Sequence, residues 1–127
     1  MLALMQRNIG LNLLEGRVQA SVLDWGSSNP QQHLVPDSSA GTSYPDIILA
    51  ADCVYFEPAF PLLQATLRDL IGPDTTCYFC FKKRRRADMQ FFAALKKQFS
   101  VKEVEDDPDR DTYSRQNIRL LTVRRKI

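Results

Sequence analysis

Apolar residues near the start of the chain recur every three or four positions, from Leu2 to Leu13. This spacing places them on one face of a helix and predicts a helix over residues 2–14, with Gly16 as its stop. No Ser, Thr, Asp or Asn stands ahead of this segment to bond its first amides, which is unusual for a helix start. We therefore expect further sequence upstream.

Two β-prone segments follow, separated by a long polar stretch. The first, "VQASVLDWG" at residues 18–26, predicts a short strand, and residues 27–44 predict a surface loop rich in Ser, Pro, Gly and Gln. The second, "PDIILAADCVYF" at residues 45–56, has apolar residues at both odd and even positions. Burial of both faces is typical of a central strand in a parallel sheet, so we expect this strand in the middle of the sheet.

The second half of the chain alternates between helices and strands. A helix is predicted from Pro58 to Leu70, because proline suits a first helical turn and Gly72 with Pro73 supplies a stop. The remaining elements are a strand over 75–83, a helix over 88–99, and strands over 100–105 and 117–125 flanking an acidic turn. This order predicts an α/β sheet with helices on both faces and an antiparallel edge hairpin at the carboxyl terminus.

Length and composition indicate the class of protein. The 127 residues, 44% of them hydrophobic, suffice for one compact domain, and a net charge of +2 gives no overall field that favours nucleic acid. No apolar run approaches the length of a membrane span, and the chain start lacks the features of a signal peptide. Three cysteines form no disulfide-scaffold spacing. We expect a soluble, cytoplasmic, monomeric protein.

The segment "CYFC" places Cys77 and Cys80 in a C-x-x-C spacing, which can indicate a metal or redox pair. Both lie within a predicted strand, where positions three apart face opposite sides of the sheet. With His33 as the only histidine, no ligand set remains, and no metal site is expected.

Unusual residues follow two of the predicted strands, where ligands bind in open α/β sheets. Trp25, in "LDWG", can cover an aromatic ligand, although a single tryptophan more often packs in the core or against a loop. Asp52, in "AADCVYFEP", is a carboxylate at the end of an apolar strand, and burial there costs free energy unless something pairs with it. Half of a pocket for a nucleoside-like ligand and a paired structural carboxylate are both consistent with these residues.

Four segments carry a resemblance to a known family: "LDWG", "PDIILAADCVYFEPAFPLL", the basic "KKRRR" and the helix "DMQFFAALKKQF". In this order the chain resembles the seven-β-strand S-adenosylmethionine-dependent protein lysine methyltransferases. It is similar in particular to members that methylate translation elongation factor 1-alpha, including fungal ones. The resemblance implies a Rossmann-like methyltransferase sheet and a protein substrate, with elongation factor 1-alpha expected.

The resemblance also implies roles for four residues. Trp25 is expected to pack against the adenine end of S-adenosylmethionine, and Ala51 to line the cofactor site with its backbone. Asp52 and Tyr55 match the family's D-x-x-Y motif, where cofactor and target lysine meet. We assign them positioning roles, because transfer from a sulfonium to an amine needs a deprotonated amine held in line within a dry slot.

The sequence departs from the family pattern in one respect. Family members have two further strands upstream, which supply a glycine-rich cofactor loop and a carboxylate for the ribose hydroxyls. Residues 1–127 therefore correspond to a partial class I methyltransferase domain lacking its first two strands. We expect this chain to bind S-adenosylmethionine weakly or not at all, and a non-catalytic remnant or protein-interaction module of the same fold remains the alternative.

The basic run Lys82 to Arg86 allows three interpretations: a solvated loop, a docking site for an acidic partner protein, or a nucleic-acid patch. No aromatic residues interleave the run and the total charge is close to neutral, so nucleic acid is the least favoured.

Overall fold

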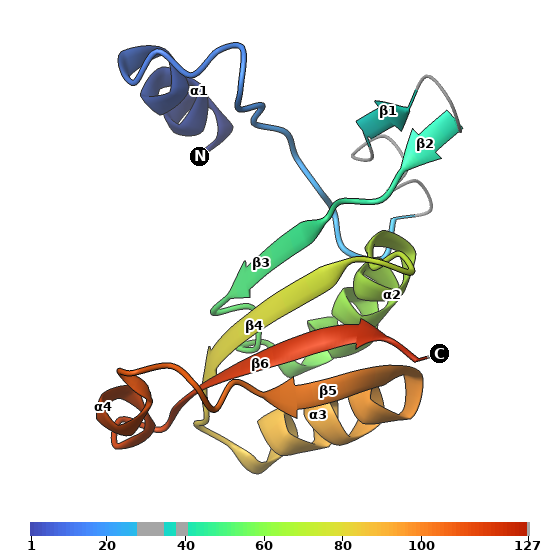
Figure 1. Cartoon of the computed structure of the whole chain (residues 1–127), viewed down its shortest axis with the longest axis vertical. Helices are drawn as coiled ribbons and strands as arrows, with labels where there is room; N and C mark the ends of the chain where they lie inside the picture. The colour runs from blue at the N-terminus through green and yellow to red at the C-terminus, as the bar shows by residue number, and fades with distance from the viewer. Residues whose placement is uncertain (28–34, 38–40, 127) are drawn as a thin grey trace.

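The computed structural model describes residues 1–27, 35–37 and 41–126 (Figure 1). Its elements, in chain order, are α1 (Leu2–Leu11), β1 (Val35–Asp37), β2 (Gly41–Ser43), β3 (Ile47–Ala51), the 3-10 helix η2 (Glu57–Ala59), α2 (Phe60–Leu70), β4 (Thr76–Lys82), α3 (Arg86–Gln98), β5 (Phe99–Glu103), α4 (Arg110–Ser114) and β6 (Ile118–Arg125).

The main sheet has four strands in the order β3-β4-β6-β5. β3 and β4 are parallel, whereas β6 runs antiparallel to both β4 and β5. A separate two-stranded hairpin, β1-β2, lies within the predicted loop over 27–44. The mixed α/β sheet and the antiparallel pair at its carboxyl-terminal end agree with the predicted fold class, and β6 takes the inner position of that pair.

The core lies on one face of the sheet. On β4, Cys77, Phe79 and Phe81 are buried while the residues between them are more exposed, which is the alternation expected of a strand covered on one side. Aromatic rings fill this face: Phe81 and Phe92 stack with centroids 4.1 Å apart, and Phe79 meets Phe92 edge-on at 5.4 Å. Such contacts add to the free energy gained from area burial.

The helices α2 and α3 share that face, as Figure 1 shows, and the rings of Phe60 and Phe91 join them at 5.2 Å. The opposite face is open over β3 and β4, where Leu49 and Tyr78 are exposed. Helix α1 contains no buried residue and lies apart from the sheet (Figure 1). Helices were expected on both faces, but of α1, α2 and α3 only the last two cover the sheet.

Residues 18–26 do not form the strand predicted for them. A strand is stable only when another strand bonds its backbone, and here Val18 and Val22 remain exposed in a segment that forms no ladder. The main sheet consequently has four strands where five were expected.

The expected central position of β3 is also wrong for this structure, because within the described residues β3 pairs with β4 alone and forms an edge. Ile47 and Leu49 are 59% and 79% exposed. Apolar residues on both faces of a strand predict burial only where elements cover both faces, and here one face is open.

Candidate functional site

The loop that follows β3, residues 52–56, carries the D-x-x-Y motif. Asp52 adopts a left-handed backbone conformation with φ of 55°, which is uncommon for any residue except glycine, although Asp tolerates it better than most. Its amide donates to the Cys80 carbonyl at 3.1 Å, so the pairing with β4 extends one residue beyond β3. Val54, 1% exposed, anchors the loop in the core. The turn is therefore fixed at both ends.

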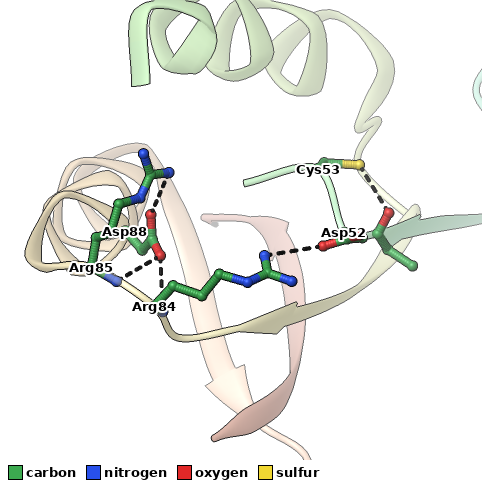
Figure 2. Close-up of polar contacts among 6 residues, drawn as sticks. Asp52, Cys53, Arg84, Arg85 and Asp88 are labelled. Carbon is green, nitrogen blue, oxygen red and sulfur yellow. Dashed lines mark hydrogen bonds and ion pairs between the residues drawn. The ribbon is translucent and has the colours of Figure 1, made fainter. Parts of the chain in front are cut away.

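The Asp52 carboxylate projects into solvent, with 74% of its side chain exposed. The sequence suggested that Asp52 would be buried and would need a partner for that reason. The left-handed turn instead places its side chain outside the sheet and in solvent. Asp52 nevertheless has a partner: Nη1 of Arg84 lies 3.4 Å from Oδ1 (Figure 2). The site thus pairs the end of β3 with the loop after β4.

A buried carboxylate holds that second loop. Asp88 is fully buried, and its Oδ2 accepts hydrogen bonds from the backbone amides of Arg84 and Arg85, each at 3.1 Å. The Arg85 guanidinium donates to Oδ1 at 3.1 Å (Figure 2). Asp88 stands in the first turn of α3 and so bonds the orphan amides ahead of the helix, as an acidic residue at this position commonly does.

Tyr55 and the neighbouring Phe56 are 62% and 57% exposed. Together with Asp52 they place a carboxylate, a phenol and an apolar ring on one short loop at the carboxyl end of β3. Ala51 lies beside them on the open face of the sheet, where it is exposed.

Trp25 lies in a different setting. It is partly buried against the core, and the adjacent Gly26 donates its amide to Thr66 Oγ1 at 3.0 Å on α2. Gly26 has φ of 79°, and a Cβ there would stand 2.6 Å from Leu62 Cδ2, so this close approach to the helix requires glycine. In the part of the chain that is described, no hydrogen bond or ion pair joins Trp25 to Asp52 or Tyr55.

The thiols of Cys53 and Cys77 are held in their neutral form. Burial, and then the charge of Asp52, raises the pKa of Cys53, whose thiol donates to the Ala51 carbonyl at 3.5 Å (Figure 2). Burial raises the pKa of Cys77 to about 12. Cys77 faces the helices and Cys80 the open face, as the strand alternation predicted. Thiolate chemistry is therefore not favoured at Cys53 or Cys77.

Metal ligands were sought across the described ranges, and no group of three His, Cys, Asp or Glu residues is placed to hold an ion there. His33 lies outside those ranges.

The strand end can contribute one side of a binding site for a flat, nucleoside-sized group. Leu49 and Ala51 both lie on the open face of β3, and both are exposed to solvent. A small side chain at Ala51 lets a ligand approach the backbone closely. The Asp52 carboxylate follows directly in the chain, so an accessible backbone and a negative charge lie next to each other at this strand end.

Sequence reasoning missed two residues of this arrangement, Arg84 and Asp88. Asp88 had a usable signal, because an acidic residue in the first turn of a helix commonly bonds the amides ahead of it. The ion pair of Arg84 with Asp52 had none, since it joins positions 32 residues apart.

Comparison with known proteins identifies the family. The sequence profile of the lysine methyltransferase family matches residues 1–98. The chain is 36% identical over 129 aligned positions to protein-lysine N-methyltransferase EFM6 of Saccharomyces cerevisiae, covering 99% of this chain and 52% of that protein. It is 37% identical to protein N-lysine methyltransferase METTL21A of Danio rerio, covering 84% and 46%, and 36% identical to EEF1A lysine methyltransferase 3 of Mus musculus, covering 82% and 42%.

This chain therefore spans about half the length of the relatives it matches. Among the residues with described positions, no helix is long and apolar enough to cross a membrane. Because the family profile covers more than half of its residues, the chain belongs to the lysine methyltransferase family.

Proposed function

We propose that this chain carries the lysine-accepting side of an S-adenosylmethionine-dependent protein-lysine N-methyltransferase that acts on a translation elongation factor, elongation factor 1-alpha being the expected substrate. The observation that carries the proposal is the loop after β3, which presents Asp52 and Tyr55 together at the strand end. Family membership supports the reaction class. The name of one relative, EEF1A lysine methyltransferase 3, supports the substrate.

In this proposal Asp52 attracts the target lysine. Its carboxylate is 74% exposed, so an incoming ammonium reaches it without rearrangement of the core. Tyr55, also exposed, orients the amine through its hydroxyl or the face of its ring. The lysine proton is released to solvent, to which both side chains are open. With the cofactor bound, the loop would hold the amine in line with the transferred methyl group, whose bond to nitrogen forms as its bond to sulfur breaks and leaves a thioether.

S-adenosylmethionine, when bound, supplies a methyl group on a sulfonium. Ala51 is the residue of the strand end that would lie against it, because its small side chain and exposed position leave the backbone accessible. Trp25 is proposed for the adenine end, and its packing against the core limits this contact to the part of the indole that remains exposed.

Methyl transfer from radiolabelled S-adenosylmethionine to purified elongation factor 1-alpha tests the proposal, using the 127-residue chain with cofactor from micromolar to millimolar concentration. Because this chain is expected to bind the cofactor weakly, we expect incorporation into lysine towards the millimolar end of that range. In Asp52→Asn we expect kcat/KM to fall about fivefold, the factor that corresponds to the loss of about 1 kcal/mol from an exposed ion pair. Tyr55→Phe keeps the aromatic ring and removes the hydroxyl, so it shows which of the two contributes to the rate. Asp69→Asn, an exposed change on α2, is the matched control and should leave the rate unaltered.

A second candidate is a non-catalytic interaction module of the same fold. The open face of the sheet favours it, because Ile47, Leu49 and Tyr78 expose apolar surface beside the site. This candidate predicts binding of the elongation factor with no methyl incorporation at any cofactor concentration, and an Asp52→Asn variant that binds as well as the parent chain.

A further inference from the structure

The side chain of Arg84 is the group that occupies the Asp52 carboxylate in this structure. Its Nη1 lies 3.4 Å from Oδ1, and the pair bridges the carboxyl ends of β3 and β4 (Figure 2). Arginine is thus placed on the carboxylate to which the proposed function assigns the target lysine.

The main chain of Arg84 is fixed, whereas its guanidinium is not. Asp88, fully buried, accepts the Arg84 amide at 3.1 Å and so sets where the side chain begins. The side chain itself is 47% exposed and its carboxylate partner is 74% exposed. An exposed ion pair is worth roughly 0.2–1 kcal/mol, so a competing cation can displace it at little cost.

The charges around Arg84 indicate which groups its guanidinium would contact after a lysine has displaced it from Asp52. Lys82, Lys83 and Arg86 are exposed, and within the described residues none of them has a carboxylate within ion-pair distance. Releasing Arg84 from Asp52 adds one more uncompensated cation to this run. Carboxylates that flank a bound lysine would be the complementary partner, since they lie next to the ammonium that has taken Asp52.

Resting on the proposed function, we propose that Arg84 is a substrate-displaced counter-ion of Asp52. It neutralises the carboxylate in the free chain, yields it to the target lysine, and then pairs with acidic residues beside that lysine. The site thereby selects lysines in acidic segments over lysines in neutral ones. Arg84 is a specificity-determining residue and takes no part in bond making.

Two peptides test this with the full chain: a pentapeptide with lysine between glycines, and one with lysine between aspartates, both blocked at their ends. Binding is followed by NMR titration of the backbone amides of Asp52 and Arg84. In Arg84→Gln we expect the neutral peptide to bind two- to fivefold more tightly, because its lysine no longer competes with Arg84 for Asp52. The acidic peptide gains the same relief but loses its pairing with Arg84, so the preference for the acidic over the neutral peptide should fall two- to fivefold.

Lys97→Gln is the matched control, because it removes one positive charge at the opposite end of α3. It should change neither affinity. The gain of Arg84→Gln for the neutral peptide should also vanish on an Asp52→Asn background, as a double-mutant cycle requires of two residues in direct contact.

The outcomes separate this inference from the proposed function. If Asp52→Asn weakens both peptides but Arg84→Gln does not tighten the neutral one, the counter-ion role is wrong and the lysine site stands. If both peptides bind and Asp52→Asn weakens neither, the lysine site itself is wrong. A third outcome would overturn the inference: an oligouridine binds more tightly than either peptide, and Arg84→Gln weakens that binding equally with aspartate or asparagine at position 52. The basic run would then be assigned to nucleic acid.

Discussion

Replacing Asp88 tests how firmly the loop after β4 is built. Asp88→Ala removes a fully buried carboxylate that accepts two backbone amides, from Arg84 and Arg85, and the Arg85 guanidinium. It also removes a negative charge from the first turn of α3. The expected result is a large loss of stability from one side chain, because two backbone amides and one guanidinium lose their acceptor.

The size of the loss follows from these contacts. A hydrogen bond to a charged group contributes about 1.5–3 kcal/mol, and the low end applies here since Arg84 and Arg85 are exposed and water can replace the acceptor. The charge at the helix amino terminus adds about 0.3–1 kcal/mol. The half-exposed Arg85 pair adds less than about 1 kcal/mol. With two amide bonds at this low end, the contributions together predict a loss near 4 kcal/mol for alanine and, since asparagine retains one acceptor oxygen, about 2 kcal/mol for Asp88→Asn.

Urea unfolding measured by fluorescence provides the assay, because Trp25 is the only tryptophan and packs against the core. Asp69→Asn is the control: it removes a carboxylate that is 40% exposed and 3.9 Å from Arg68, so its effect should stay within about 0.5 kcal/mol. A loss below about 1 kcal/mol for Asp88→Ala would refute the view that this carboxylate organises the loop. The asparagine variant keeps the test open should the alanine variant fail to fold.

Three further predictions follow from other parts of the molecule. A hydrogen bond from Arg119 lowers the pKa of Glu103 below its ordinary 4.5, so the ion pair stabilises the fold above pH 4.5. This contribution, under about 1 kcal/mol at this exposure, is lost as the pH falls through the lowered pKa. Glu103→Gln should therefore flatten the decline in stability at acid pH measured by urea unfolding, and an unchanged decline would contradict this prediction. Cys77, buried and with a pKa of about 12, should resist iodoacetamide at pH 8 while Cys80 reacts, as peptide mass spectrometry can show, and equal labelling would be inconsistent with the described core. Leu49→Thr, on the exposed edge strand, should leave the stability measured by urea unfolding within about 0.5 kcal/mol, whereas a large destabilisation would mean that Leu49 is buried.

The sequence was sufficient for most of the local structure. Pro58 and the Gly72-Pro73 pair bounded the helix that the structure places at η2 and α2, and the residues of β4 alternate between the two faces as predicted. These features depend on the backbone restrictions of proline and on the alternation of side chains along a strand. Both are determined by a few adjacent residues.

What the sequence did not predict depends on distant partners. Whether residues 18–26 form a strand is decided by the presence of a second strand beside them, which no property of "VQASVL" reveals. The exposure of β3 is decided in the same way. The short helix α4 within the acidic turn, and the ion pair between Asp52 and Arg84, likewise require the folded arrangement to be known.

The backbone at Asp52 decides which substitution gives an interpretable test of the site. A residue other than glycine at φ of 55° carries strain, commonly of order 1 kcal/mol or more, and Asp and Asn tolerate it better than other side chains. Asp52→Ala would combine loss of the carboxylate with added backbone strain, and the bond from the Asp52 amide to the Cys80 carbonyl could shift with it. Asp52→Asn removes the charge alone. If asparagine weakens lysine binding while the fold keeps its stability, the effect belongs to the charge; if asparagine and alanine act alike and both destabilise the chain, the role of Asp52 is to form the turn that presents Tyr55.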